Sequence, residues 1–395
     1  MTIARCWGRA SAAAVCLAAL PSLASAQLAP LSTFGGGDGY LVTGDRTYLT
    51  ADHSQRGLEY NPLTNNLYVV DRDGNNTRGG LAVHMLDGTT GAHVRSLNVS
   101  GVTGGHAGTF AGNQIQVADD GAIYLANMVV NGGTDNFRIW RWANEAATIS
   151  APTLVYEGNP AAGGSSTNIR VGDSFDIRGG GASTQMIFGV RHTPNPADIR
   201  AVIFNTTDGT TYSPKLVTNT VAGPGSFYIG TAWGNGNQFY GNTAGASNPV
   251  FHMGVDPSSG AATVLATNAK DGSGSFTDAG MTAIEYHPAL NAMVGVVTGN
   301  RTDHHVQLYD LNDFSDAVLL DSDQLPNAGD AGIAGMEAGF TNGNGTGAIA
   351  FGPDGRVYAL ITNVGLAAYT VPEPGSVMLL AVGGLAMLRR RRGSR

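Results

Sequence analysis

Residues 57–70 read GLEYNPLTNNLYVV, two short apolar segments on either side of a polar turn. Each segment has the length and the aromatic and β-branched content of a strand, so the pair predicts a β-hairpin. The arrangement recurs as NQIQVADDGAIYL (113–125), SFDIRGGGASTQMIFGV (174–190), FYIGTAWGNGNQFY (227–240), GMTAIEYHPALNAMVGVV (280–297) and TGAIAFGPDGRVYALI (346–361). Asp120-Gly121 and Asp354-Gly355 are strong hairpin signals. The sequence therefore predicts six related hairpins.

Most of these hairpins are followed by two further apolar segments. LAVHML (81–86) and HVRSLNV (93–99) follow the first hairpin, and similar pairs follow the next four. The sixth hairpin is followed only by GLAAYT (365–370). The repeats begin near residues 58, 115, 174, 227, 281 and 348, and a unit of four strands over about 50 residues is typical of a β-propeller blade.

A strand ahead of the first repeat can complete the sixth. Two candidates precede it, GYLVTG (39–44) and RTYLT (46–50). Pairing either with residues 365–370 would close the ring and remove an exposed sheet edge. We therefore predict an all-β fold over residues 27–370, a six-bladed β-propeller with four-stranded blades whose last blade is closed by an N-terminal strand. Two stacked β-sheets are the alternative that this pattern leaves open.

The N-terminal residues 1–26 have the pattern of a secretory signal peptide. Arg5 and Arg9 supply positive charge, and the apolar stretch 10–23 is too short to span a bilayer. The expected cleavage-site residues are Ala24, Ala26 and Gln27. The mature chain is therefore expected to begin at Gln27.

The C-terminal residues 371–395 have three successive parts: a Pro-Glu-Pro triplet, the apolar stretch 375–388 and an arginine cluster. Fourteen helical residues span about 21 Å, and flanking residues and snorkelling arginines extend that reach toward a hydrocarbon core of about 30 Å. Cationic residues after an apolar segment stay in the cytoplasm. A transmembrane helix is therefore expected, with a stop-transfer cluster made of Arg389, Arg390, Arg391 and Arg392.

In these three parts and in their order, the tail resembles the PEP-CTERM sorting domain. The resemblance implies recognition by exosortase, a membrane protease-transpeptidase, in a Gram-negative bacterium that makes exopolysaccharide. It also implies that Pro372, Glu373 and Pro374 are the recognition residues. The sequence pattern of residues 57–91 is similar to that of propeller regions common among PEP-CTERM proteins. This resemblance implies a fold and no activity.

Composition narrows the choice of partners. Seven of the 22 basic residues lie in the two terminal segments, so the mature body is expected to be more acidic than the formal net charge of −8. An acidic surface repels phosphate backbones, and nucleic acid is therefore not an expected partner. The two cysteines, Cys6 and Cys16, lie in the signal segment, so no disulfide or thiolate metal site is expected in the mature protein.

Loop lengths indicate where a site would lie. If the strands of each blade are lettered A to D from the centre outward, the B–C and D–A loops are mostly the longer ones. In a propeller these loops share one rim of the central channel, and loops on a rigid scaffold usually carry function. This rim is the predicted binding face.

Several residues are candidates for that face or the adjoining strands. The chain has no evident cofactor motif. Asp71, Asp73 and Asn75 have the spacing of oxygen ligands for calcium, although the EF-hand pattern is absent. Asp303, His304 and His305 are a zinc-type candidate, although adjacent histidines on a strand point to opposite faces. Further candidates are His106, Arg191 and His192 for an acidic sugar, and Glu59 and Glu285 as a carboxylate pair.

No catalytic motif such as G-x-S-x-G, H-E-x-x-H or a phosphate loop occurs in the sequence. We therefore predict an exported cell-surface or extracellular-matrix protein, sorted through its tail, with a non-enzymatic role in binding or organising exopolysaccharide. The alternative is a secreted propeller enzyme, a glycan lyase or hydrolase. A cluster of carboxylates and histidines that converges at the channel mouth would favour the enzyme, and a scattered polar rim would favour binding.

Overall fold

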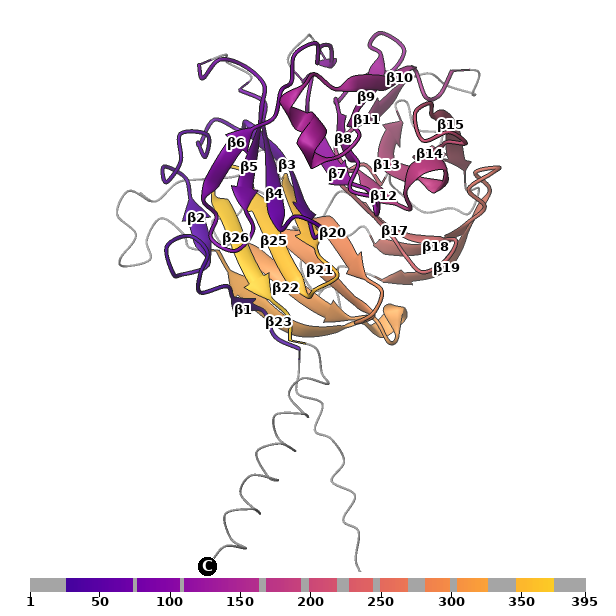
Figure 1. The fold of residues 1–395 in the computed structure, drawn as a ribbon. Coiled ribbons are helices and arrows are strands. Elements are labelled where there is room, and N and C mark those ends of the chain that lie inside the picture. The colour runs from indigo at the N-terminus through magenta and orange to yellow at the C-terminus, as the bar shows by residue number, and fades with distance from the viewer. Residues whose placement is uncertain are drawn as a thin grey trace, which may run out of the picture. The chain divides into compact units, whose positions relative to one another are not determined.

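The computed structural model describes residues 26–73, 77–106, 110–162, 168–192, 199–218, 227–243, 249–268, 281–298, 304–325 and 346–372. These residues belong to one unit, Ala26–Pro372, in which six antiparallel sheets surround a common centre (Figure 1). The predicted six-bladed propeller with four-stranded blades is therefore confirmed. The predicted signal peptide and sorting helix lie outside the described residues, and within them no helix is long and apolar enough to cross a membrane.

Five blades follow one another along the chain, each running from an inner to an outer strand. Blade 1 contains β3 (Gln55–Asn61), β4 (Asn66–Asp71), β5 (Ala82–Asp87) and β6 (His93–Ser96). Blade 2 contains β7 (Gln114–Val117), β8 (Ile123–Ala126), β9 (Phe137–Trp142) and β10 (Thr153–Gly158). Blade 3 contains β11 (Ile169–Val171), β12 (Asp176–Arg178), β13 (Gln185–His192), β14 (Ile199–Asn205) and β15 (Ser213–Thr218). Blade 4 contains β16 (Gly230–Trp233), β17 (Gln238–Asn242), β18 (Val250–Val255) and β19 (Ala262–Asn268), and blade 5 contains β20 (Met281–His287), β21 (Ala292–Val297), β22 (His305–Asp310) and β23 (Val318–Gln324).

The sixth blade joins the two ends of the propeller. It contains β24 (Gly347–Phe351), β25 (Arg356–Ile361) and β26 (Gly365–Thr370), and the N-terminal β1 (Ala29–Pro30) and β2 (Tyr40–Val42) both pair with the free edge of β26 (Figure 1). Leu41 lies opposite Leu366. The first candidate segment, 39–44, therefore contains a closing strand, whereas 46–50 is a loop that buries Tyr48 and Leu49.

The inner strands pack closely around the centre. Asn113, Gln114 and Gln116 donate side-chain hydrogen bonds to the carbonyls of Gly172, Asp173 and Phe175, over 2.6, 2.8 and 3.1 Å. A Cβ at Gly57 would lie 2.9 Å from the Asn113 carbonyl oxygen, so only glycine allows β3 to approach β7 this closely. Direct strand contact leaves a narrow central channel.

The hydrophobic core lies between neighbouring blades. The cluster between blades 2 and 3, for example, joins Phe137 of β9 to Phe188 and Phe204 of blade 3, with ring centroids 5.0 and 5.9 Å from Phe137. Each sheet buries both faces in this way, which explains the nearly continuous apolar runs in the middle strands. The blades therefore hold the inner strands, and the side chains that line the channel, in fixed positions.

Candidate functional site

The strand register places the longer loops at one end of the channel. Gln55 at the start of β3 pairs with Asp71 at the end of β4, and Asp71 pairs with Ala82 at the start of β5. The loop before β3 and the loop between β4 and β5 therefore lie at the same end of blade 1, as the sequence predicts. We call this end the long-loop mouth and define it by Arg56, Arg72, Asn113, Arg170 and Asp173.

Three arginines gather at the long-loop mouth. Arg56, which is only 6 % exposed, donates hydrogen bonds to the hydroxyls of Thr346 and Thr362. Arg72 donates to Asn113 Oδ1 over 3.3 Å and to the His53 carbonyl over 3.0 Å, while its buried Nε has no partner among the described residues. Arg170 holds Asp173 with two bonds of 2.6 Å.

The surroundings of Arg56 and Arg72 disfavour their charge, whereas the hydrogen bonds with Asp173 raise the pKa of Arg170. Burial lowers the pKa of Arg56 to about 10, although the Asp173 carboxylate opposes this shift. Burial also lowers the pKa of Arg72 to about 9, with the Arg56 guanidinium as the next cause. The mouth therefore concentrates positive charge that its own carboxylate, Asp173, only partly balances.

Aromatic rings accompany the guanidinium groups. Arg72 lies over the ring of Phe110, 4.3 Å from its centroid, and Arg170 and Arg191 lie 5.5 and 5.7 Å from the centroid of Tyr228. These distances are typical of cation–π contacts. The mouth thus combines planar cations with half-buried aromatic rings.

Three carboxyl groups lie deeper, on the inner strands of blades 1, 3 and 5. Glu59, Asp176 and Glu285 occupy equivalent register positions, opposite Tyr68, Ile187 and Val294. Burial raises the pKa of Glu59 and Glu285 well above the usual value, and charge on Asp176 raises both further. Burial raises the pKa of Asp176 to about 6, against the amides of Trp233 and Ile177, which donate to it and favour its ionised form.

The sequence predicts Glu59 and Glu285 as a carboxylate pair, whereas Asp176 was not among the predicted residues. The signal was available, because SFDIR (174–178) occupies the same place in its repeat as GLEYN (57–61). Asp176 is one methylene group shorter than Glu59, and the third repeat is irregular, so the equivalence of the two positions is hard to recognise in the sequence. The remaining inner-strand positions of this ring are Gln116, Ala232 and Ala350.

The channel between the mouth and this carboxyl ring is nearly closed. Its cavity offers about 30 Å³ of room for water-sized groups and is lined by all six blades, from Asp173 near the mouth to Gln116 and Glu285 below. Sites for drug-sized ligands have volumes of roughly 300–1,000 Å³. A sugar ring therefore has no room beside Glu285.

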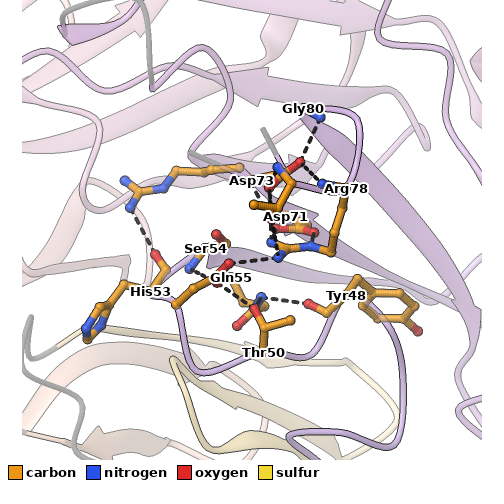
Figure 2. A network of polar contacts seen from close by, with 12 residues as sticks. Tyr48, Thr50, His53, Ser54, Gln55, Asp71, Asp73, Arg78 and Gly80 are labelled. Atoms are coloured by element: carbon orange, nitrogen blue, oxygen red, sulfur yellow. Dashed lines mark hydrogen bonds and ion pairs between the residues drawn. The ribbon is translucent and has the colours of Figure 1, made fainter. Parts of the chain in front are cut away.

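Asp71 and Asp73, the predicted calcium ligands, accept hydrogen bonds from protein donors. Figure 2 shows them gathered around Arg78, whose Nη2 and Nε bond the two oxygens of Asp71 over 2.8 and 2.9 Å. Although burial opposes it, the amides of Gly80, Arg78 and Thr77 hold the pKa of Asp73 below its ordinary value. These bonds join residues 77–80 to Asp71 and Asp73, and the third candidate, Asn75, lies outside the described residues.

The other candidates are dispersed around the same end of the blades. Arg191 is exposed, whereas His192 is 6 % exposed and neither ring nitrogen has a partner among the described residues. His106 stacks on Phe110 and approaches Asp135 to 3.4 Å. His304 is fully buried, next to the half-exposed His305, and Asp303 is not described. Within the described ranges, no three His, Cys, Asp or Glu side chains are arranged to hold a metal ion.

Comparison with protein families identifies the tail. The PEP-CTERM protein-sorting motif matches residues 370–392, a range that includes Pro372, Glu373 and Pro374 and the four arginines. The chain therefore carries this sorting signal, which makes it an exported protein processed at the membrane by an exosortase. Fold and tail together define the class, an exported surface β-propeller. Comparison with curated protein sequences gave no match.

Solved structures with a similar fold cover most of the chain. A DUF4623 family protein from Bacteroides eggerthii is 16 % identical with a TM-score of 0.52, over 84 % of this chain and 74 % of that one. A luciferin-regenerating enzyme is 14 % identical (TM-score 0.48, 84 % and 95 % covered), and regucalcin from Agrobacterium tumefaciens, a calcium-binding protein, is 13 % identical (TM-score 0.46, 82 % and 94 % covered). At these identities the likeness concerns the fold alone.

Proposed function

We propose that this exported protein is a non-enzymatic surface protein whose propeller binds exopolysaccharide at the long-loop mouth. The observation that carries the proposal is the set of planar groups there, Arg72 over Phe110 and Arg170 and Arg191 over Tyr228. Sugars offer apolar C–H faces to aromatic rings and hydroxyl groups to guanidinium donors. An array of both kinds on a rigid scaffold suits a long, flexible polymer that is held at the surface.

Binding is favoured over glycan cleavage by the position of the carboxyl groups. Glycosidases place two carboxyl groups on either side of the scissile bond. Glu285 instead lines a cavity with about 30 Å³ of room, below the inner-strand segment that carries Asp173. A glycan held at the mouth would not bring its glycosidic bond to this ring.

The proposal is tested by measuring how the processed protein, with its complete propeller, binds intact polysaccharide. We expect Tyr228→Ala to weaken binding about tenfold, because a central aromatic contact commonly contributes more than 1 kcal/mol. Leu154→Ala, which changes an exposed side chain on the outer strand β10, is the control and should bind normally. The proposal fails if a glycan array detects no ligand, or if Tyr228→Ala binds as well as the unchanged protein.

Sorting is proposed to depend on Glu373 within the Pro-Glu-Pro triplet. Proline cannot continue a helix inward, so the triplet would stay extended and open to the exosortase, with Glu373 as its only charge. We expect Glu373→Ala to leave the propeller folded but the protein uncleaved as an inner-membrane intermediate. Neutral residues at Arg389, Arg390, Arg391 and Arg392 should instead weaken stop-transfer. Cell fractionation and intact mass measure both effects, and normal processing of Glu373→Ala would refute this role.

A further inference from the structure

We propose that Arg56 and Arg72 form the floor of an anion-binding site at the long-loop mouth, and that the site takes the carboxylate group of an acidic sugar. The inference deepens the proposed function, because it assigns a ligand class to the same mouth. It rests on three features of the described residues: the charge balance, the hydrogen bonding of Arg56 and the aromatic rings beside Arg72 and Arg170.

The charge balance at the mouth is positive. Arg56, Arg72 and Arg170 interact with one another and with Asp173, whose carboxylate is already held by Arg170 through two bonds of 2.6 Å. The next carboxylate, Asp52, bonds Arg78 over 2.7 Å. Two guanidinium groups therefore lack a carboxylate partner among the described residues, and burying unpaired charges is costly.

The hydrogen-bond acceptors of the Arg56 guanidinium are uncharged hydroxyl groups. Nη1 donates to the hydroxyls of Thr346 and Thr362, and the part of the chain that the structure describes offers the other N–H groups no acceptor. A carboxylate can accept two parallel N–H bonds from one guanidinium group and carries the opposite charge, which a threonine hydroxyl does not. An entering carboxylate would give Arg56 and Arg72 the charged acceptor that the chain itself does not supply.

The aromatic rings can hold a sugar beside the arginines. Phe110 lies against Arg72 and Tyr228 against Arg170, so a pyranose stacked on either ring would bring its acidic substituent to the guanidinium groups. The cavity of about 30 Å³ below the mouth is lined by Asp173 and Glu285 rather than by these arginines, and it takes no part in the site. A planar carboxylate also matches the guanidinium fork, in which two parallel N–H donors meet two oxygens.

Paired ligands test the inference. A uronate oligosaccharide and the same oligosaccharide after its carboxyl groups are reduced to alcohols differ only in the proposed determinant. We expect the unchanged protein to bind the acid form at least tenfold more tightly at low salt, with the preference shrinking as salt screens the charges. Arg56→Met and Arg72→Met should each remove the preference.

Two variants control for charge and folding. Arg356→Met removes an arginine next to the Asp354 turn, beside Tyr60, and should keep the tenfold preference. Arg72→Lys keeps the charge but loses the fork, and should give an intermediate preference with an unchanged melting curve. Retention of the full preference in both methionine variants, or equal binding of acid and reduced forms by the unchanged protein, would overturn the inference.

The outcome also separates this inference from the proposed function. Binding of reduced and acid oligosaccharides with equal affinity would refute the anion site and leave the exopolysaccharide role standing. If the protein binds free glucuronate but no oligosaccharide, and Arg72→Met loses the glucuronate, the anion site would stand and the exopolysaccharide role would be refuted.

Discussion

A mature chain that lacks residues 27–43 should fail to fold into a soluble, cooperative domain. Those residues supply β1 and β2, the two strands that cover the free edge of β26. They also supply four side chains that are at least nine-tenths buried: Leu28, Phe34, Leu41 and Val42. At about 1.5–3 kcal/mol for each, their burial contributes roughly 6–12 kcal/mol. That is close to the whole stability of a typical domain, about 5–15 kcal/mol.

The loss should appear as aggregation as well as instability. Without its cover, β26 presents a row of unpaired backbone groups, which is a template for pairing with another chain. Far-ultraviolet circular dichroism and size-exclusion chromatography of the shortened chain measure the two effects. A monomer with the spectrum and melting behaviour of the full mature chain would show that the N-terminal strands do not close the ring.

Single substitutions give the same test on a folded protein. Phe34→Ala should lower the free energy of unfolding by about 3–5 kcal/mol, because the ring is fully buried against Tyr358 and blade 1. Ser32→Ala, at an exposed position two residues away, should change it by less than about 0.5 kcal/mol. Chemical denaturation of both variants makes the comparison.

Sequence reasoning recovered the blades because each is a local pattern. A hairpin such as GLEYNPLTNNLYVV carries its own strand and turn signals, and six copies define the ring. Local sequence signals do not decide which of the segments 39–44 and 46–50 forms the strand that closes the sixth blade. Tyr48 and Leu49 are as buried as residues of a strand, and only pairing with β26 distinguishes Leu41 from them.

The candidate site could be predicted only in outline. The rim followed from loop lengths, but the mouth depends on Arg56, Arg72 and Arg170, and Arg170 comes from a distant repeat. Ring closure, which no short motif encodes, brings them together. The pattern around Asp71 and Asp73 matches calcium ligands, but the sequence alone did not show that Arg78, only a few residues further on, contacts both carboxylates.

Glu59→Gln and Glu285→Gln should each stabilise the propeller at pH 8 and leave its stability nearly unchanged at pH 4. Burial raises the pKa of both carboxyl groups in the folded protein, and the neighbouring Asp176 raises it further. Between the unfolded pKa, about 4.3, and the higher folded pKa, the folded state binds more protons than the unfolded state. The free energy of unfolding therefore falls as pH rises through this window.

Glutamine removes the ionisable group while keeping its size, so the fall should be smaller in each variant. We expect a gain at pH 8 that builds up by at most about 1.4 kcal/mol for each pH unit of this window, and melting temperatures measured from pH 4 to pH 8 would show it. Asp316→Asn, which neutralises an exposed carboxylate, should leave the pH profile unchanged. If Glu59→Gln and Glu285→Gln follow the unchanged protein at every pH, the carboxyl ring does not hold its protons in the way that its burial implies.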